Sequence, residues 1–228
     1  MHQTVNNIYY KFIPSNVVSF DKITTGIIKM DNDIYEKYEA TTEVKGELII
    51  CKDATKMKQY VKQIVQEDYA TYLETIEKRD AKKDSWIYNI IDGISEQESI
   101  LYKDDKCIVF LNYCWDQTNV EQLQLLCMPM DKTLRTIRSL EYKDIPLIQH
   151  MKQVTLQVIR EKYNLEEGHI KMYFHYEPST YHLHIHFTNT LLTQIASSVE
   201  YSHELNSVLF NLSVMSDYYK VVKLNIRI

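Results

Sequence analysis

The feature that most constrains the fold of this chain is a short run of alternating residues. Between positions 182 and 187 three histidines alternate with three large apolar residues, in the order His182-Leu-His-Ile-His-Phe187. Successive side chains of a β-strand point to opposite faces of its sheet. The run therefore predicts one strand whose apolar face lines a core and whose other face carries all three imidazoles.

Clustered imidazoles allow two kinds of chemistry. Three of them can fill three positions of a tetrahedral zinc ion and leave the fourth to water. Same-face side chains two residues apart lie about 7 Å apart along a strand, which is too far for three consecutive ones to reach one ion without strong twist. The alternative is attack by a neutral imidazole on phosphorus, giving a covalent phosphoramidate, while its neighbours donate hydrogen bonds to the phosphate oxygens. We favour attack on phosphorus without a metal over a zinc site, and over the interpretation that the histidine-rich strand is accidental.

Composition narrows the class of protein. The chain has 228 residues, of which 45% are hydrophobic, enough for one large domain or two small ones. A net charge of −5 argues against an extended grip on long nucleic acid, although a local pocket for a small anion is compatible with it. The four cysteines lack CxxC spacing and predict reduced thiols. The polar opening predicts no secretory signal, and no apolar run is long enough for a membrane helix.

Apolar periodicity predicts an α+β fold with a largely antiparallel sheet. Strands are expected near residues 27–30, 48–51, 106–111, 122–127, 170–175, 182–187 and 222–228. Helices are expected near residues 57–65, 143–163 and 205–212. Gly168 is expected to break the chain after the long helix, and the charged stretch 77–84 is either a boundary or a solvated helix end.

Several further motifs occur in a fixed order. They are Asn32-Asp-Ile-Tyr35, Trp86-Ile-Tyr-Asn-Ile-Ile-Asp92 with Glu96, Ile137-Arg-Ser-Leu140 before Ile145-Pro-Leu-Ile148, the segment 172–188 around the alternating histidines, and Ser198-Val-Glu200 with His203. Taken together, these motifs resemble the scavenger mRNA-decapping (DcpS) branch of the histidine-triad (HIT) superfamily. The resemblance covers about residues 27–228.

The resemblance implies a hydrolase that acts on the residual 5′ mRNA cap. The substrate would be m7GpppN or a capped short oligonucleotide, and the products would be m7GMP and a nucleoside or oligonucleotide diphosphate. His184 matches the nucleophile, and Ser179 matches the phosphate-contacting serine of the turn. The phosphate-contacting imidazoles match His175, His182 and His186.

Recognition of the methylated base follows from the residue chemistry as well. A 7-methylguanine ring is positively charged, and an aromatic face attracts that charge. Trp86 is the best face available, and the Glu96 carboxylate can accept from the N1–H and N2–H donors of the ring. Asn32 matches a residue that contacts the cap base from the N-terminal lid, whereas Trp115 is interpreted as structural.

The resemblance also implies an assembly. Residues 1–68 would form a small lid and dimerisation domain with a hinge helix that begins near Asp53, and residues 69–228 a HIT-like catalytic domain. The apolar stripe from Met57 to Val65 favours a homodimer with exchanged N-terminal segments. The family implies no cofactor, no membrane and a cytoplasmic enzyme that also occurs in the nucleus.

The chain departs from the family pattern around the phosphates. Asn112, Cys114 and Tyr201 stand where the family usually has aspartate, lysine and arginine, and Thr180 replaces a tyrosine. The N-terminal region is also shorter than usual. Residues that could compensate for the two missing cations are Lys106, Lys171 and Arg138. The departures leave two alternatives open, namely a broader dinucleoside-polyphosphate hydrolase and a weakly active cap-binding protein.

Overall fold

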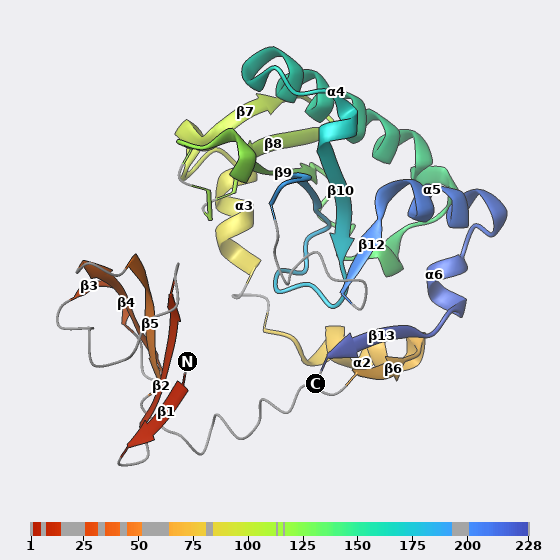
Figure 1. Ribbon diagram of the computed structural model, residues 1–228. Coiled ribbons are helices and arrows are strands. Elements are labelled where there is room, and N and C mark those ends of the chain that lie inside the picture. The colour runs from red at the N-terminus through yellow and green to blue at the C-terminus, as the bar shows by residue number, and fades with distance from the viewer. Residues whose placement is uncertain are drawn as a thin grey trace. The chain divides into compact units, whose positions relative to one another are not determined.

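The computed structural model describes residues 2–5, 8–14, 26–31, 35–41, 45–51, 64–80, 84–112, 114–115, 117–192 and 201–227. The chain divides into two compact units, residues 1–63 and 64–228. Each unit has its own sheet, and each is described separately below (Figure 1). None of the helices in the described part of the chain has the length and apolar content that crossing a bilayer requires.

The first unit contains a five-stranded antiparallel sheet in the order β1-β2-β5-β4-β3. Its strands are β1 (His2–Val5), β2 (Ile8–Pro14), β3 (Gly26–Asp31), β4 (Tyr35–Thr41) and β5 (Lys45–Cys51). The strands expected near residues 27–30 and 48–51 are confirmed as β3 and β5. Asn32, Asp53 and most of the expected hinge helix lie outside the described residues.

The second unit is larger and mixed. Its elements are β6 (Ile64–Glu67), α2 (Tyr69–Lys78), α3 (Ser85–Ile91), η4 (Gln97–Ser99), β7 (Ile100–Lys103), β8 (Cys107–Leu111), η5 (Val120–Gln122), β9 (Gln124–Pro129), η6 (Ile137–Ser139), η7 (Tyr142–Asp144), α4 (Ile145–Tyr163), η8 (Glu167–His169), β10 (Ile170–His175), β11 (Ile185–Asn189), β12 (Ser202–Glu204), α5 (Leu205–Val214), α6 (Tyr218–Val221) and β13 (Leu224–Arg227). Six strands form one antiparallel sheet in the order β12-β10-β11-β9-β8-β7. The predicted α+β class with a mainly antiparallel sheet is confirmed.

Alternation along the strands gives this sheet two different faces. One face packs against α4 and α5 in the main core, to which the sheet contributes Val109, Cys127, Met172, Phe174, Ile185 and Phe187. The other face of β8 and β9 packs against α3 through a smaller cluster of Ile87, Ile90, Ile91, Ile108, Phe110, Leu126 and Met128. Residues of β10 and β11 that point away from α4 therefore share a side of the sheet with α3 (Figure 1).

A short ribbon joins the two ends of the second unit. β6 pairs antiparallel with β13, with Val65 opposite Ile226 and Ile64 opposite Arg227. The helical expectation for residues 57–65 is therefore wrong at Ile64 and Val65, because partner strand β13, remote in sequence, supplies backbone hydrogen bonds that favour an extended chain. The same pairing explains why the division between the units falls just before Ile64.

One expectation about the six-stranded sheet needs correction. The run of alternating histidines is a strand only from Ile185 onward, where pairing with Cys127 of β9 begins. His182 and His184 precede it in irregular chain, held where the Leu183 N–H donates to the Leu134 carbonyl at 2.8 Å. The prediction of one strand with three imidazoles on one face is therefore wrong. The same alternation of residues is also compatible with an extended loop.

The long helix and its flanking strands are as expected, except for the residue at which the helix terminates. The paired strands 106–111 and 122–127 are confirmed as β8 and β9, and the helix 143–163 as α4. The break assigned to Gly168 is wrong, because α4 ends at Asn164, which adopts the left-handed conformation with φ of 54°. Asparagine tolerates this conformation and can terminate a helix as glycine does. Gly168 lies in η8.

Candidate active site

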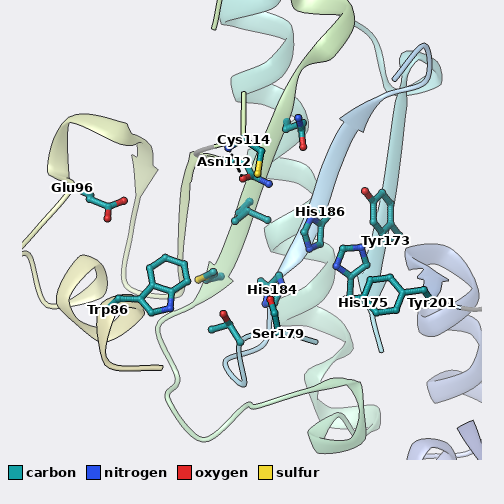
Figure 2. A pocket seen from close by; sticks show the side chains of 14 residues that line it. Trp86, Glu96, Asn112, Cys114, Tyr173, His175, Ser179, His184, His186 and Tyr201 are labelled. Atoms are coloured by element: carbon teal, nitrogen blue, oxygen red, sulfur yellow. Dashed lines mark hydrogen bonds between the residues drawn. The ribbon is translucent and has the colours of Figure 1, made fainter. Parts of the chain in front are cut away.

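A cavity of about 530 Å³ lies on the α3 side of the six-stranded sheet (Figure 2). Its lining comes from α3, the segment around Glu96, strands β9, β10 and β11, and the turns that flank them. The lining residues are Trp86, Glu96, Asn112, Cys114, Gln124, Leu126, Met128, Tyr173, His175, Ser179, Thr180, His184, His186 and Tyr201. Figure 2 shows Trp86 and Glu96 at one end, with His184 and Ser179 in the middle and His175 and Tyr201 at the other end.

The protonation of His184 is fixed by one hydrogen bond. Its Nδ1 lies 2.8 Å from the main-chain carbonyl oxygen of His182. A carbonyl oxygen can only accept, so Nδ1 carries the hydrogen and Nε2 carries the free lone pair of the neutral ring. Burial lowers the pKa of His184, which keeps the ring neutral near pH 7. His184 therefore offers a neutral imidazole nitrogen within a cavity.

Two further imidazoles lie beside His184. The pairing of β10 with β11 puts Tyr173 opposite His186 and brings His175, two residues along β10, close to the same ring. The ring centroids of His175 and His186 lie 4.0 Å apart, and those of His184 and His186 lie 5.0 Å apart. The buried Nε2 of His186 has no hydrogen-bond partner among the described residues, and burial holds the pKa of His186 well below its usual range. An unpartnered buried nitrogen at this position is suited to a ligand.

His182 lies apart from this cluster. Its side chain is completely buried, its Nε2 donates to the Pro129 carbonyl at 2.8 Å, and its ring meets that of Tyr88 edge-on. It is absent from the residues that line the cavity. The structure therefore assembles His175, His184 and His186 in place of the expected run of three. His182 contributes its carbonyl, which the sequence pattern did not indicate.

Two groups of side chains in the described residues have the geometry to hold a metal ion. In the cavity, one ligand nitrogen each from His175, His184 and His186 lie within 4.8 Å of one another, a set that could take zinc with an open fourth position. The second group, outside the cavity, is Asp104, Cys107 and His150. There Asp104 already accepts from the His150 ring at 2.7 Å and from several other donors, so its oxygens serve a structural network.

The residues expected to hold the methylated base lie together at one end of the cavity. Trp86 is the second residue of α3, and 36% of it is exposed. Glu96 precedes η4 in the left-handed conformation with φ of 53°, and its side chain reaches the cavity (Figure 2). Trp115, by contrast, is buried and donates to the Asn119 carbonyl, in agreement with its structural interpretation. Asn32 lies outside the described residues.

The end of the cavity that is expected to hold the phosphates lacks fixed positive charge in the described residues. Asn112, Cys114 and Tyr201 all line it, but no lysine or arginine of the described residues does. None of the three residues expected to compensate for the missing cations lines the cavity. Arg138 is completely buried in an ion pair with Glu67, the Lys171 amine donates to the Leu192 carbonyl, and Lys106 is exposed outside the lining.

Sequence reasoning missed several residues of the site. Tyr173, Gln124, Leu126 and Met128 line the cavity without having been predicted. For Tyr173 a signal existed, because it lies two residues before His175 and therefore on the same face of the predicted strand. In the structure its ring stacks on His186 at 5.2 Å with an interplanar angle of 5°. The β9 residues could be found only from the strand order, which a single sequence does not give.

Residues 85–200 match the family model described as scavenger mRNA decapping enzyme, C-term binding, and this segment contains the α3 end of the cavity and all three clustered histidines. The chain belongs to the scavenger mRNA decapping enzyme family. Membership in this decapping family confirms the resemblance read from the sequence.

Curated relatives extend the match beyond that segment. The m7GpppX diphosphatase of Ascaris suum is 32% identical over 225 residues, which cover 91% of this chain and 75% of the relative. The human m7GpppX diphosphatase is 25% identical over 208 residues, covering 85% of this chain and 62% of the relative. The chain thus spans less than two thirds of the human relative. The solved structure of Hnt3 in complex with DNA and guanosine shares 17% identity, with a TM-score of 0.41 and coverage of 61% of this chain and 82% of that one, which is too little to argue from.

Proposed function

We propose that this chain hydrolyses the residual mRNA cap, m7GpppN or a capped short oligonucleotide, with His184 as the nucleophile. The observation that supports this most is the Nδ1 hydrogen bond of His184 to the His182 carbonyl, at 2.8 Å. It leaves the Nε2 lone pair available on a residue that lines the cavity, between the base end and the paired imidazoles. The relatives named m7GpppX diphosphatase support the same substrate.

The base end of the cavity suits a methylated guanine. The half-exposed Trp86 ring offers a face on which the cationic ring can stack. Glu96 is the only acidic residue among the described residues that line the cavity, and its carboxylate can accept from both donors on the guanine edge. A neutral adenine has no matching pair of donors and would leave the carboxylate unsatisfied.

In the first step Nε2 of His184 attacks the phosphorus that carries the 5′ oxygen of 7-methylguanosine. The P–Nε2 bond forms, the bond from that phosphorus to the bridging oxygen breaks, and the electron pair leaves on the oxygen of the departing diphosphate. The product is the nucleoside diphosphate and a covalent m7G-phosphohistidine. The Nδ1–H bond to the His182 carbonyl stabilises the positive charge that the ring acquires.

In the second step water attacks the same phosphorus. The P–Nε2 bond breaks, its electron pair returns to Nε2, and the water proton passes to solvent, giving m7GMP and the original neutral His184. Ser179 and the His175–His186 pair are the residues that would hold the phosphate oxygens through both steps. His182, whose ring binds Pro129, would act through its carbonyl on His184.

The missing cations favour one alternative. Because the described lining contains no lysine or arginine, stabilisation of the transition state rests on imidazoles and hydroxyls. This favours slow turnover and keeps a weakly active cap-binding protein as the second candidate. A broader dinucleoside-polyphosphate hydrolase would differ by ignoring the base.

One experiment separates the three. Turnover and equilibrium binding are measured for m7GpppG, GpppG and ApppA with the full chain. Cleavage of m7GpppG in clear preference to ApppA supports the proposal. Tight binding of m7GpppG with turnover no faster than that of the His184→Asn variant identifies a binding protein, and equal cleavage of ApppA identifies the broader hydrolase.

The organisation of the whole protein is part of the proposal. Residues 1–68 would act as a lid and dimerisation domain and residues 69–228 as the catalytic domain, in a homodimer. The enzyme would function in the cytoplasm and also in the nucleus, without a cofactor. Light scattering at micromolar concentration tests the assembly. A fully active monomer would contradict it.

A further inference from the structure

The ion pair between Arg79 and Asp84 connects the two ends of the cavity, although neither residue is among those that line it. Arg79 follows α2, and Asp84 precedes α3. The Arg79 Nε and Nη2 donate to the two carboxylate oxygens of Asp84 at 2.9 and 2.8 Å. Their side chains are only 15% and 5% exposed. This is the two-point geometry in which an arginine–carboxylate pair is strongest and most directional.

The pair does not serve the helix beside it. Asp84 occupies the position before the first residue of α3, where aspartate usually accepts from the helix backbone. Its side chain makes no such bond. Instead Oδ1 accepts from the main-chain N–H of Tyr181 at 3.0 Å, across a long separation in sequence. A residue suited to cap a helix is therefore used to hold a different segment.

Arg79 holds the same segment from its other side. Its Nη2 donates to the Ser179 carbonyl at 2.8 Å, and its guanidinium lies over the Tyr181 ring at 4.1 Å from the centroid. Tyr181 is buried. The turn that carries Ser179 is thus bound at both ends by one guanidinium–carboxylate pair.

The segment held in this way leads directly into the site. Ser179 and Thr180 line the cavity, and the chain continues through His182, whose carbonyl fixes the His184 ring. On the opposite side of the pair, Asp84 is two residues before Trp86. Any shift of the pair would displace both the proposed base-stacking residue and the proposed phosphate-binding turn.

We propose that Arg79 and Asp84 are positioning residues that couple the base end of the cavity to its phosphate end. This inference rests on the proposed function, because it assigns the pair a role in that reaction. Neither residue would touch the substrate. Each acts through the backbone of residues 179–181 and through the start of α3.

The chemistry of the pair suits a permanent clamp. Burial alone would raise the pKa of the Asp84 carboxyl, but the hydrogen bonds from Arg79 and from the Tyr181 N–H hold it below its ordinary value. The bond to Asp84 likewise raises the pKa of Arg79. Both groups stay charged across the working range of the enzyme, so the clamp does not open by titration.

Three variants test the proposal. Arg79→Lys keeps the charge but cannot reach both carboxylate oxygens and the Ser179 carbonyl at once. Arg79→Ala removes the clamp and leaves a gap that added methylguanidinium can fill. Arg160→Ala is the matched control, because Arg160 makes a similar pair with Glu166 at 2.8 Å but is 64% exposed and outside the cavity.

The expected result is a loss of kcat/KM for m7GpppG of about 10- to 100-fold in Arg79→Ala, with a rise in KM and a fall in kcat together. Arg79→Lys should lose activity while keeping the melting temperature close to that of the parent. Methylguanidinium should restore activity to Arg79→Ala but not to Arg160→Ala, which needs none. Unchanged kinetics in Arg79→Lys, or a loss that methylguanidinium leaves untouched in a folded Arg79→Ala, overturns the proposal.

A readout independent of turnover separates this proposal from the proposed function. In Arg79→Ala the Tyr181 amide should exchange with solvent faster, and faster exchange should be confined to the peptide 179–184 and the start of α3. Unchanged exchange there overturns the clamp even if m7GpppG is cleaved. If the parent chain cleaves no capped dinucleotide while exchange rises as expected, the proposed function fails and the coupling of the two segments stands.

Discussion

The imidazole rings of His175 and His186 lie 4.0 Å apart, on neighbouring strands that run in opposite directions. Positive charge on one of two rings this close disfavours positive charge on the other, because like charges repel one another. Burial and the neighbouring histidines lower the pKa of His186 accordingly. The pair is therefore suited to bind an anion, and binding of that anion would favour positive charge on the rings.

Ligand binding should take up protons. An approaching phosphate raises the pKa of the imidazoles that it contacts, so the complex holds protons that the free protein does not. Affinity for a cap analogue with a methylene in place of the scissile oxygen should rise as pH falls from 8 to 6, by up to about tenfold per pH unit for each proton taken up. Titration calorimetry in buffers of different ionisation enthalpy counts these protons. An enthalpy independent of the buffer would contradict the prediction, and His186→Asn should reduce the count.

Removing the nucleophile should separate chemistry from binding. His184→Asn should lower kcat by several powers of ten, since no covalent intermediate can form, while the affinity for m7GpppG changes little because Trp86 and Glu96 remain. Rapid acid-free quenching followed by mass spectrometry should detect the m7G-phosphohistidine in the parent protein only. His150→Asn is the control, because that ring bonds to Asp104 outside the cavity. Activity above about a tenth of the parent level in His184→Asn would remove it from the role.

Much of this site could be predicted from the sequence, but the arrangement of its residues could not. The strands around it and α4 follow from apolar periodicity, which depends on neighbours along the chain. The position of His182 does not, because alternation fits both a strand and the irregular segment that the Leu134 carbonyl holds in place. The meeting of His175 with His186 needed the register of β10 against β11, which is set by contacts distant in sequence.

Arg138 shows the same limit more sharply. The sequence offered it as a cation for the phosphates, yet it does not line the cavity, and its partners are the Glu67 carboxylate, the Tyr176 hydroxyl and main-chain carbonyls. A single sequence cannot distinguish an arginine that binds a ligand from one that is buried among carbonyls. The distinction depends on which segments the fold brings together.

Loss of Arg138 should therefore reduce stability. Its side chain is 0% exposed, and it donates to the Glu67 carboxylate, the Tyr176 hydroxyl and the carbonyls of Tyr219 and Val222. Arg138→Met should lower the free energy of unfolding by about 3–5 kcal/mol, because it leaves the Glu67 charge buried without its partner. Arg160→Met, which breaks an exposed pair, should cost under about 1 kcal/mol. Urea unfolding at pH 7 measures both, and equal losses would contradict the assignment.

Acid should destabilise the protein before its carboxylates titrate. Burial lowers the pKa values of His182, His184, His186 and His203. Below an ordinary histidine pKa of about 6.5, the unfolded chain binds protons that the folded chain refuses, so stability falls as pH drops from 6.5 toward the lowered values. Above a pH of about 6.5 these histidines are neutral in both states, so they do not reduce the free energy of unfolding. The melting temperature should be flat from pH 8 to 7 and should fall between pH 6.5 and 5, and a rise on acidification would show that the rings are protonated in the fold.

Base specificity gives the most discriminating prediction about the substrate. Stacking of a cationic ring on Trp86 contributes about 0.5–2 kcal/mol, which corresponds to a preference of about threefold to thirtyfold for the methylated cap. Trp86→Ala should weaken binding and erase much of this preference, whereas Trp86→Phe should keep part of it. Glu96→Gln should relax the choice of guanine over adenine, because a neutral amide can satisfy either base edge. At saturating substrate the chemical step at His184 should survive in all three variants.

The measurement is kcat/KM for m7GpppG, GpppG and ApppA in the parent and in each variant. Trp86 and Glu96 line the same end of the cavity (Figure 2). The two effects should nevertheless be separable, since the Trp86 ring would read methylation and the Glu96 carboxylate would read the guanine edge. A double variant should therefore lose both preferences, and a departure from the product of the single losses would measure how far the two residues are coupled through the shared base. If the parent cleaves ApppA as well as m7GpppG, or if Trp86→Ala keeps the full preference for methylation, the base end of the cavity has another ligand and the broader polyphosphate hydrolase replaces the proposal.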